Sequence, residues 1–182
     1  AVQYAPAGEH DRPAIAVFVG ERALAVTGID LTPAMLAKLR QKHPDKRLTL
    51  ICGDYFKAAL GEAHFDCAVS FQTMHHFAPE AKTRLYRSIR RALAPGGCYI
   101  ECDYMVADQA EEDFYFAENA RLRREQKIPD GAFYHYDTPC TAANQRAMLR
   151  EAGFASVRQA YRVENTTILV AEVGRQPANP YK

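Results

Sequence analysis

The sequence predicts an α/β protein with a doubly wound, mostly parallel sheet. Short apolar segments typical of strands alternate with amphipathic helical segments over the first hundred or so residues. Strands that alternate with helices run parallel, because a crossover through a helix returns the chain to the same edge of the sheet. The chain then closes with two apolar segments around Glu164-Asn165, which is typical of an antiparallel hairpin.

The stretch ALAVTGIDLTPAML, residues 23–36, predicts a strand that ends at Asp30 and leads directly into a helix. Thr32 can cap free N–H groups, and Pro33 is well suited to the first helical position. The helix should stop at Pro44. Its apolar face is expected to carry Met35, Leu36 and Leu39.

Two further strands, a helix and a fourth strand are expected next. Residues 47–54 form a strand that ends in Gly53-Asp54, and residues 67–71 are apolar enough to be buried on both faces. A helix over 79–97 ends at a Pro-Gly-Gly sequence, and a strand follows over 98–105.

The last third of the chain departs from this alternation. Residues 108–128 predict one long helix with an acidic start and a basic end, which suits the helix dipole. An irregular aromatic stretch spans 132–140, and a helix over 141–154 is capped by its first threonine. Two strands, at about 155–163 and 166–173, make the closing hairpin.

Composition indicates a single globular domain, residues 1–182, with 48% hydrophobic and 25% charged residues. The net charge of +1 makes a nucleic-acid partner unlikely. No apolar run is long enough to span a membrane and no signal peptide is evident, so we expect a cytoplasmic protein without a membrane partner. Four of the five cysteines lie in strand-like segments and are expected to be buried, reduced thiols: Cys52, Cys67, Cys98 and Cys102.

Acidic residues stand at the ends of two predicted neighbouring strands. Asp30 could accept hydrogen bonds from a ribose diol, and Asp54 could accept one from the amine of an adenine. Each residue could equally be an ordinary turn or cap residue, and only the pair, with a helix between, points to a nucleoside site.

The order of five segments adds a family resemblance. These segments are VTGIDLTPAMLAKLR, LICGDYF, FDCAVSFQTMHHF, RALAPGGCYIECDYM and LREAGFASVRQAYR. Together they resemble successive segments of class I S-adenosylmethionine-dependent methyltransferases, which have a Rossmann-like fold, over roughly residues 15–173. The resemblance implies a seven-stranded sheet with a C-terminal antiparallel hairpin, a helical lid insertion at about 106–140, and S-adenosyl-L-methionine as cofactor.

The same resemblance assigns cofactor contacts by position. Asp30 would hold the ribose hydroxyls, and Asp54 would meet the adenine amine, with Gly53 and Tyr55 beside the ring. Leu31 would pack on its other face. The methionine end would be lined by Ser70, Phe71 and Gln72.

Candidates for contact with the methyl acceptor, expected to be a small molecule, lie in two places. His75, His76 and Tyr104 follow strands at the cofactor edge and could act as a base or hydrogen-bond partner. Each could instead simply support a neighbouring helix or the core. In the lid, the aromatic residues that suit a small organic acceptor are Tyr115, Tyr134, His135 and Tyr136. Glu101 and Asp103 could meet a cationic acceptor, while no metal is expected because adjacent histidines usually point apart.

One family feature is not found. No glycine-rich loop of the D-x-G-x-G-x-G kind precedes Asp30, and Ile15, Phe18, Val19 and Arg22 have the spacing of a helix. Either the printed sequence leaves out the first strand or its loop, or the protein lacks the loop and has a degenerate fold. The sequence therefore predicts a methyltransferase, for which we also expect a homodimer. Two alternatives stay open: a methyltransferase-like binding or partner module without turnover, and a nicotinamide-dependent oxidoreductase.

Overall fold

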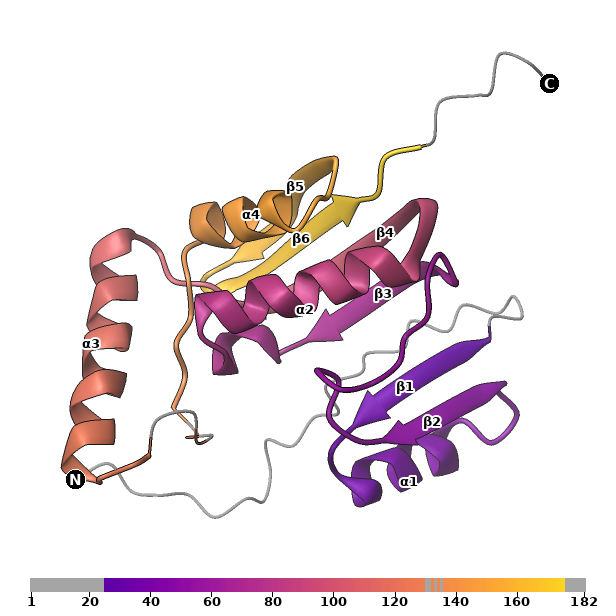
Figure 1. Cartoon of the computed structure of the whole chain (residues 1–182), viewed down its shortest axis with the longest axis horizontal. Helices are drawn as coiled ribbons and strands as arrows, with labels where there is room; N and C mark the ends of the chain where they lie inside the picture. The colour runs from indigo at the N-terminus through magenta and orange to yellow at the C-terminus, as the bar shows by residue number, and fades with distance from the viewer. Residues whose placement is uncertain (1–24, 130–131, 133, 135, 176–182) are drawn as a thin grey trace. The chain divides into compact units, whose positions relative to one another are not determined.

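The computed structural model describes residues 25–129, 132, 134 and 136–175. The chain divides between Ala58 and Ala59 into two compact units, and each is described by itself (Figure 1). The candidate residues Ile15, Phe18, Val19 and Arg22 lie outside the described residues.

The first unit is a single βαβ motif. Strand β1 (Val26–Asp30) pairs in parallel with β2 (Leu48–Cys52), and helix α1 (Pro33–Lys42) connects them. Pro33 occupies the helix start as predicted, but Thr32 makes no side-chain capping bond. The predicted apolar face is confirmed, since the buried residues of α1 are Met35, Leu36 and Leu39.

The second unit is built on a four-stranded sheet with the order β3-β4-β6-β5. Strand β3 (Phe65–Phe71) is parallel to β4 (Leu93–Tyr104), and α2 (Pro79–Ala92) is their crossover. Strand β6 (Thr166–Glu172) runs antiparallel to both β4 and β5 (Ser156–Val163), so the predicted closing hairpin is confirmed.

Helices α2 and α4 (Ala142–Glu151) lie side by side on one face of this sheet (Figure 1). The core beneath them is dense with large side chains, and Tyr86, Tyr99, Leu149 and Leu169 are at most 1% exposed. Helix α3 (Gln109–Glu125) stands apart from the sheet, and Asp108 and Thr141 cap α3 and α4 through their side chains.

The structure differs from the sequence expectations in three respects. The six described strands form two sheets, and a single seven-stranded sheet is not seen among the residues that the structure describes. Helix α2 ends at Ala92, and the Pro-Gly-Gly sequence lies inside β4 at an irregularity opposite the start of β3. The four cysteines expected to be buried are not: Cys52 and Cys67 are exposed, and Cys98 and Cys102 are partly buried. Strands β2 and β3 are edge strands of their sheets as described, so their side chains have less cover and β3 is only partly buried.

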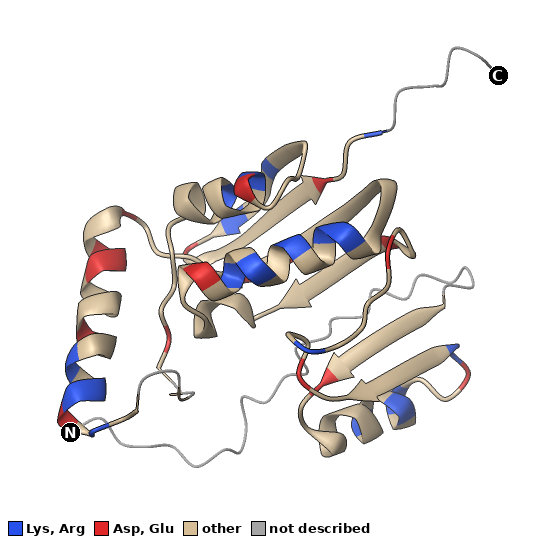
Figure 2. Cartoon of the chain, in the orientation of Figure 1, with Lys and Arg blue, Asp and Glu red and all other residues tan. Residues whose placement is uncertain are grey.

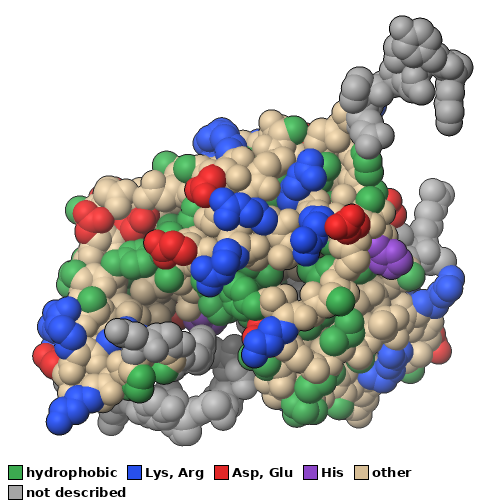
Figure 3. All heavy atoms as spheres, in the orientation of Figure 1, with side chains coloured by type: hydrophobic (Ala, Val, Ile, Leu, Met, Phe, Trp, Pro, Cys, Tyr) green, Lys and Arg blue, Asp and Glu red, His purple; other side chains and the backbone are tan. Residues whose placement is uncertain are grey.

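Charge is spread over the surface in mixed signs. Arginines recur along α2, while α3 is acidic in its first turn and basic in its last (Figure 2). Acidic side chains lie among the basic ones on the face shown in Figure 3, and Arg87 of α2 pairs with Glu151 of α4 at 2.7 Å. These pairs indicate a solvated, ion-paired helix surface rather than a continuous basic patch.

Candidate functional site

In the first unit, the carboxyl ends of β1 and β2 bring the predicted adenosine residues together. Asp30 lies opposite Cys52 in the parallel register, and the N–H of Gly53 donates to the carbonyl oxygen of Asp30 at 2.9 Å. Asp54 is the next residue along. This edge is where open α/β sheets bind ligands, because loops leave the sheet there with free polar groups.

Both aspartates also make local turns. An Oδ1 of Asp30 accepts from the N–H of Thr32 at 2.6 Å, and an Oδ1 of Asp54 accepts from the N–H of Phe56 at 2.9 Å. Asp30, and not the hydroxyl of Thr32, therefore satisfies a free N–H at the start of α1. A carboxylate has about four acceptor positions, so one such bond leaves capacity for a ligand.

Apolar side chains flank these carboxylates. Leu31 is 64% exposed and Phe56 is 38% exposed, while Tyr55 is partly buried with its ring 5.7 Å from that of Phe56. Exposed leucine and aromatic side chains beside paired carboxylates are suited to an adenine ring.

In the second unit, the three residues predicted to line the methionine end of the cofactor differ from one another in burial and hydrogen bonding. The Oγ of Ser70 is buried and lies 2.6 Å from the hydroxyl of Tyr99, so it is engaged in the core. Gln72 has a positive φ of 49° and its N–H donates to the carbonyl of Cys102. Phe71 is partly buried at the end of β3.

Glu101 belongs to a buried network and not to the acceptor rim. Its carboxylate accepts from Tyr86 at 2.7 Å, from Tyr99 at 3.1 Å and from Gln145, and the residue is fully buried. Burial raises its pKa to about 7, and the negative charge of nearby Asp103 adds to the increase. It therefore holds α2 and α4 onto the sheet.

Asp103 organises the loop that follows β3. The residue is 1% exposed, and its Oδ2 accepts from the backbone N–H of Met74 at 2.6 Å and of Thr73 at 3.3 Å. Its Oδ1 accepts from the backbone N–H of the neighbouring Tyr104 at 2.7 Å and contacts the Nδ1 of His75. Since every one of these contacts is internal, Asp103 positions His75 and is not available to a cationic acceptor.

The two adjacent histidines converge on one carboxylate. The Nε2 of His75 lies 3.7 Å from Oδ1 of Asp137, and the Nδ1 of His76 lies 3.0 Å from the same oxygen. The two imidazole rings are 4.0 Å apart, edge to face. Burial lowers the pKa of His75, but the hydrogen bond and charge of Asp103, with the charge of Asp137, outweigh it and leave the pKa raised.

A row of tyrosines extends from these histidines along the insertion. The Tyr104 ring lies 6.3 Å from that of His75, and its hydroxyl lies 3.0 Å from the hydroxyl of Tyr115. The Tyr115 ring lies 6.5 Å from that of Tyr136, which stacks on Tyr134 at 6.4 Å. The structure thus brings together all the predicted acceptor residues except His135, which lies outside the described residues.

The insertion leaves and returns at one point of the rim. Val106 and Thr141 form an isolated parallel bridge, and the N–H of Val106 donates to the carbonyl of Cys140 at 3.2 Å. Buried Glu112 of α3 accepts from the N–H of Thr141 at 2.5 Å, which ties the start of α3 to that of α4. Beyond this anchor α3 has little cover, and Phe114 is 62% exposed.

Sequence reasoning missed Asp137 entirely and misjudged Asp103. Neither has a local signal, since each acts on residues more than twenty-five positions away. A buried carboxylate at the end of a strand, two residues after another acid, was the one available indication for Asp103.

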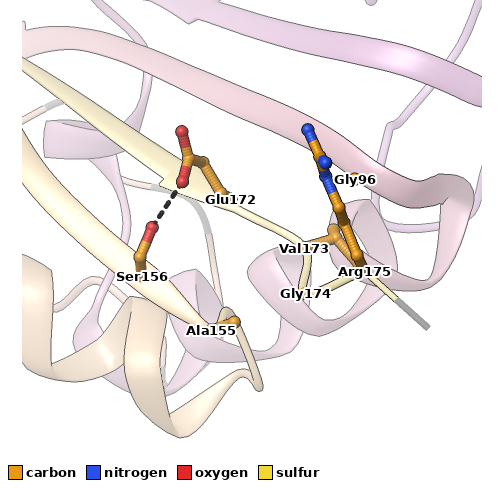
Figure 4. A pocket seen from close by; sticks show the side chains of 7 residues that line it. All are labelled: Gly96, Ala155, Ser156, Glu172, Val173, Gly174 and Arg175. Atoms are coloured by element: carbon orange, nitrogen blue, oxygen red, sulfur yellow. Dashed lines mark hydrogen bonds between the residues drawn. The ribbon is translucent and has the colours of Figure 1, made fainter. Parts of the chain in front are cut away.

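A surface hollow lies at the other end of the four-stranded sheet. It is lined by residues including Gly96, Ser156, Glu172 and Arg175, and Ser156 donates to Glu172 at 2.8 Å (Figure 4). Because it lies by the amino end of β4, away from the strand ends that carry His75 and Tyr104, it is not part of the candidate site. Within the described residues, no helix has the length and apolar character needed to cross a membrane.

Comparison with known proteins agrees with this geometry. A family model described as a methyltransferase domain matches residues 14–97. The chain is 25% identical over 166 residues to a carboxy-S-adenosyl-L-methionine synthase of Chromohalobacter salexigens, covering 82% of this chain and 59% of the relative. It is 30% identical over 111 residues to a cycloartenol-C-24-methyltransferase of Arabidopsis thaliana, covering 60% of this chain and 30% of the relative.

A solved structure shares the fold. The 1,6-didemethyltoxoflavin-N1-methyltransferase of Burkholderia thailandensis, solved with its substrate and S-adenosylhomocysteine, has a TM-score of 0.57 and 20% identity. The alignment covers 82% of this chain and 61% of that one. The chain spans less than two thirds of the length of the two curated relatives named above.

The chain is similar to S-adenosylmethionine-dependent methyltransferases, since a methyltransferase-domain model matches residues 14–97 and a solved methyltransferase shares its fold. The cofactor of that family is S-adenosyl-L-methionine, which fits the two carboxylates and exposed apolar side chains at the ends of β1 and β2.

Proposed function

We propose that this protein transfers the methyl group of S-adenosylmethionine to a small-molecule acceptor. The observation that carries the proposal is the edge formed by β1 and β2, where Asp30 and Asp54 follow paired strand ends and Gly53 links them. In this assignment Asp30 accepts from the ribose diol and Asp54 from the adenine amine, while Leu31 and Tyr55 flank the base.

The acceptor would lie along the tyrosine row of the second unit. Tyr104, Tyr115 and Tyr136 offer aromatic surface with hydroxyl groups, which suits a small, mostly apolar molecule with a few polar atoms. Methyl transfer from a sulfonium needs the nucleophile placed close to the methyl carbon and shielded from water, since the cofactor carries the leaving group. Residues 106–140 would act as the lid that excludes water.

We also propose that the two described sheets are parts of one seven-stranded sheet. Strands β1 and β3 are both edge strands as described, yet β3 has the near-continuous apolar sequence typical of an interior strand. A two-stranded parallel sheet is also too small to be stable alone. Pairing with further parallel strands would satisfy such edges, and an experimental structure would test this.

The second candidate is a methyltransferase-like binding or partner module without turnover. The observation that favours it is the sequence before Asp30, where no glycine-rich loop of the D-x-G-x-G-x-G kind is found. We also propose that the protein is a homodimer and is located in the cytoplasm. Light scattering would test the first and cell fractionation the second.

The binding half of the proposal is tested by thermal unfolding with S-adenosylhomocysteine and, separately, with NAD. A ligand at 100 times its dissociation constant stabilises the folded state by about 2.7 kcal/mol, which for a chain of this size corresponds to roughly 5–11 °C. Asp30→Asn keeps an oxygen for the N–H of Thr32 but removes the charge, so most of the shift should disappear. Asp45→Asn, on an exposed loop of the same unit, is the matched control.

The outcomes separate the candidates. A shift with S-adenosylhomocysteine that Asp30→Asn abolishes supports the assignment. Transfer of a radioactive methyl group from S-adenosylmethionine to a mixture of small phenols and amines then tests turnover. Binding without any turnover favours the second candidate, and a shift with NAD alone favours an oxidoreductase. An undiminished shift in Asp30→Asn means that the ribose lies elsewhere.

A further inference from the structure

The loop after β3 and the insertion together present three metal-ligating side chains. They are His75, His76 and Asp137, and one donor atom from each lies within 4.8 Å of the other two. His75 is buried, whereas the carboxylate of Asp137 is 45% exposed, so the group opens to solvent on one side.

The spacing of the donor atoms suits a tetrahedral ion. With metal–ligand distances of 2.0–2.1 Å, tetrahedral donors lie about 3.3–3.4 Å apart. The distances from Oδ1 of Asp137 are 3.7 Å to Nε2 of His75 and 3.0 Å to Nδ1 of His76, which bracket that value. The donor nitrogens of the two histidines lie within 4.8 Å of each other, so the three donors converge on one region.

Asp103 fixes the orientation of the His75 ring. Asp103 contacts Nδ1 of His75 and so keeps the proton there, which leaves the lone pair of Nε2 facing Asp137. A carboxylate behind a ligating histidine is the usual support of such a ligand, because it fixes both the tautomer and the ring orientation.

The third ligand is tied to the first through the backbone. The N–H of Thr138 donates to the carbonyl of His75 at 2.7 Å, and its hydroxyl contacts the same oxygen at 3.3 Å. Asp137 is thus held beside the histidines by its neighbour, although more than sixty residues separate them in the sequence.

From this arrangement we infer that His75, His76 and Asp137 form a binding site for one divalent transition-metal ion, with Zn²⁺ as the best-suited probe. Two imidazoles and one carboxylate leave a fourth position open to water or to an oxygen of a bound molecule. This inference replaces the sequence expectation that the adjacent histidines diverge, and it does not depend on methyl transfer.

One consequence does rest on the proposed function. An ion here would lie beside Tyr104 at the acceptor rim, and a coordinated hydroxyl loses its proton more readily than a free one. The acceptor class would then be a hydroxyl compound whose oxygen gives its proton to solvent and takes the methyl group.

The site is tested by binding of the metal alone to the full chain. After treatment with a chelator and its removal, isothermal titration with Zn²⁺ should show one tight site per chain, and Co²⁺ should give the visible absorption of a four-coordinate ion. Asp137→Asn and, separately, His76→Gln should each weaken Zn²⁺ binding by about tenfold or more. His64→Gln, at an exposed position of the same unit, should leave it unchanged.

Circular dichroism and thermal melting of each metal-free variant show whether it is folded. Because two ligand variants are made, the test can still be carried out if one of them does not fold. The inference is overturned if the wild-type chain takes up no Zn²⁺ at up to 100 µM, on the order of a weak nonspecific contact. It is equally overturned if both ligand variants bind as tightly as the wild type. Because activity is not the readout, a failure here leaves the proposed methyl transfer standing.

Discussion

Asp103 should be the single carboxylate on which the loop after β3 depends most. Its two oxygens meet the backbone N–H groups of Thr73, Met74 and Tyr104 and the imidazole of His75. Asp103→Asn has one oxygen in place of two, so an amide N–H₂ must face either backbone donors or the Nδ1–H of His75. At least one charge-assisted hydrogen bond is then lost in a buried site.

The expected loss of stability follows from that count. One hydrogen bond to a charged group contributes about 1.5–3 kcal/mol, so the melting temperature should fall by roughly 3–12 °C. Urea unfolding followed by circular dichroism, together with calorimetry, measures both quantities. Asp66→Asn, at an exposed position in β3, should change stability by no more than about 0.5 kcal/mol.

A second measurement separates positioning from stability. Nitrogen-15 NMR of the imidazoles should find the proton of His75 on Nδ1 in the wild type, because Asp103 accepts it, and should find that preference lost in Asp103→Asn. An unchanged denaturation midpoint together with an unchanged tautomer in the variant would refute the role given to Asp103.

Two further changes test the core and the sheet. Because burial raises the pKa of Glu101 to about 7, the folded state holds its proton more tightly than the unfolded state, so stability should fall as pH rises from about 4.5 to 7 and then level off. Glu101→Gln should flatten that part of the unfolding profile in urea, and a slope unchanged by the substitution would contradict the assignment. Gly97→Ala would place a Cβ 2.9 Å from the carbonyl oxygens of Ala94 and Asp66, so it should cost about 1–3 kcal/mol in urea unfolding. Gly53→Ala, whose Cβ meets nothing within 4 Å, is the matched control and should not lower stability.

The elements that could be predicted from sequence are those specified by local patterns. The alternation of apolar strands with amphipathic helices predicted β1, α1 and β2, and the cap of α4 at Thr141 was predicted from residue type alone. The closing hairpin was predicted by the Glu164-Asn165 turn between two apolar segments, for the same reason.

The features that could not be predicted depend on contacts between distant segments. Helix α2 was expected to continue to the Pro-Gly-Gly sequence, but β4 takes over from Leu93 because that residue pairs with Phe65. Asp30 was expected to accept hydrogen bonds from a ligand, and in the structure it also accepts one from the nearby backbone N–H of Thr32. The contact between His75 and Asp137 could not be predicted from a local sequence pattern, because the two residues lie far apart in the sequence.

The bridge between Val106 and Thr141 allows the segment between them to vary in length at little cost in stability. Because the intervening segment starts and ends at adjacent positions, changes of length after Glu112, which bonds to the start of α4, leave the hydrogen bonding of β4 as it is. Doubling the length of a flexible loop adds only about 0.6 kcal/mol of closure entropy. Related proteins could therefore differ in this insertion, and so in the acceptor molecules that they bind, while the part of the chain that carries Asp30 and Asp54 stays constant.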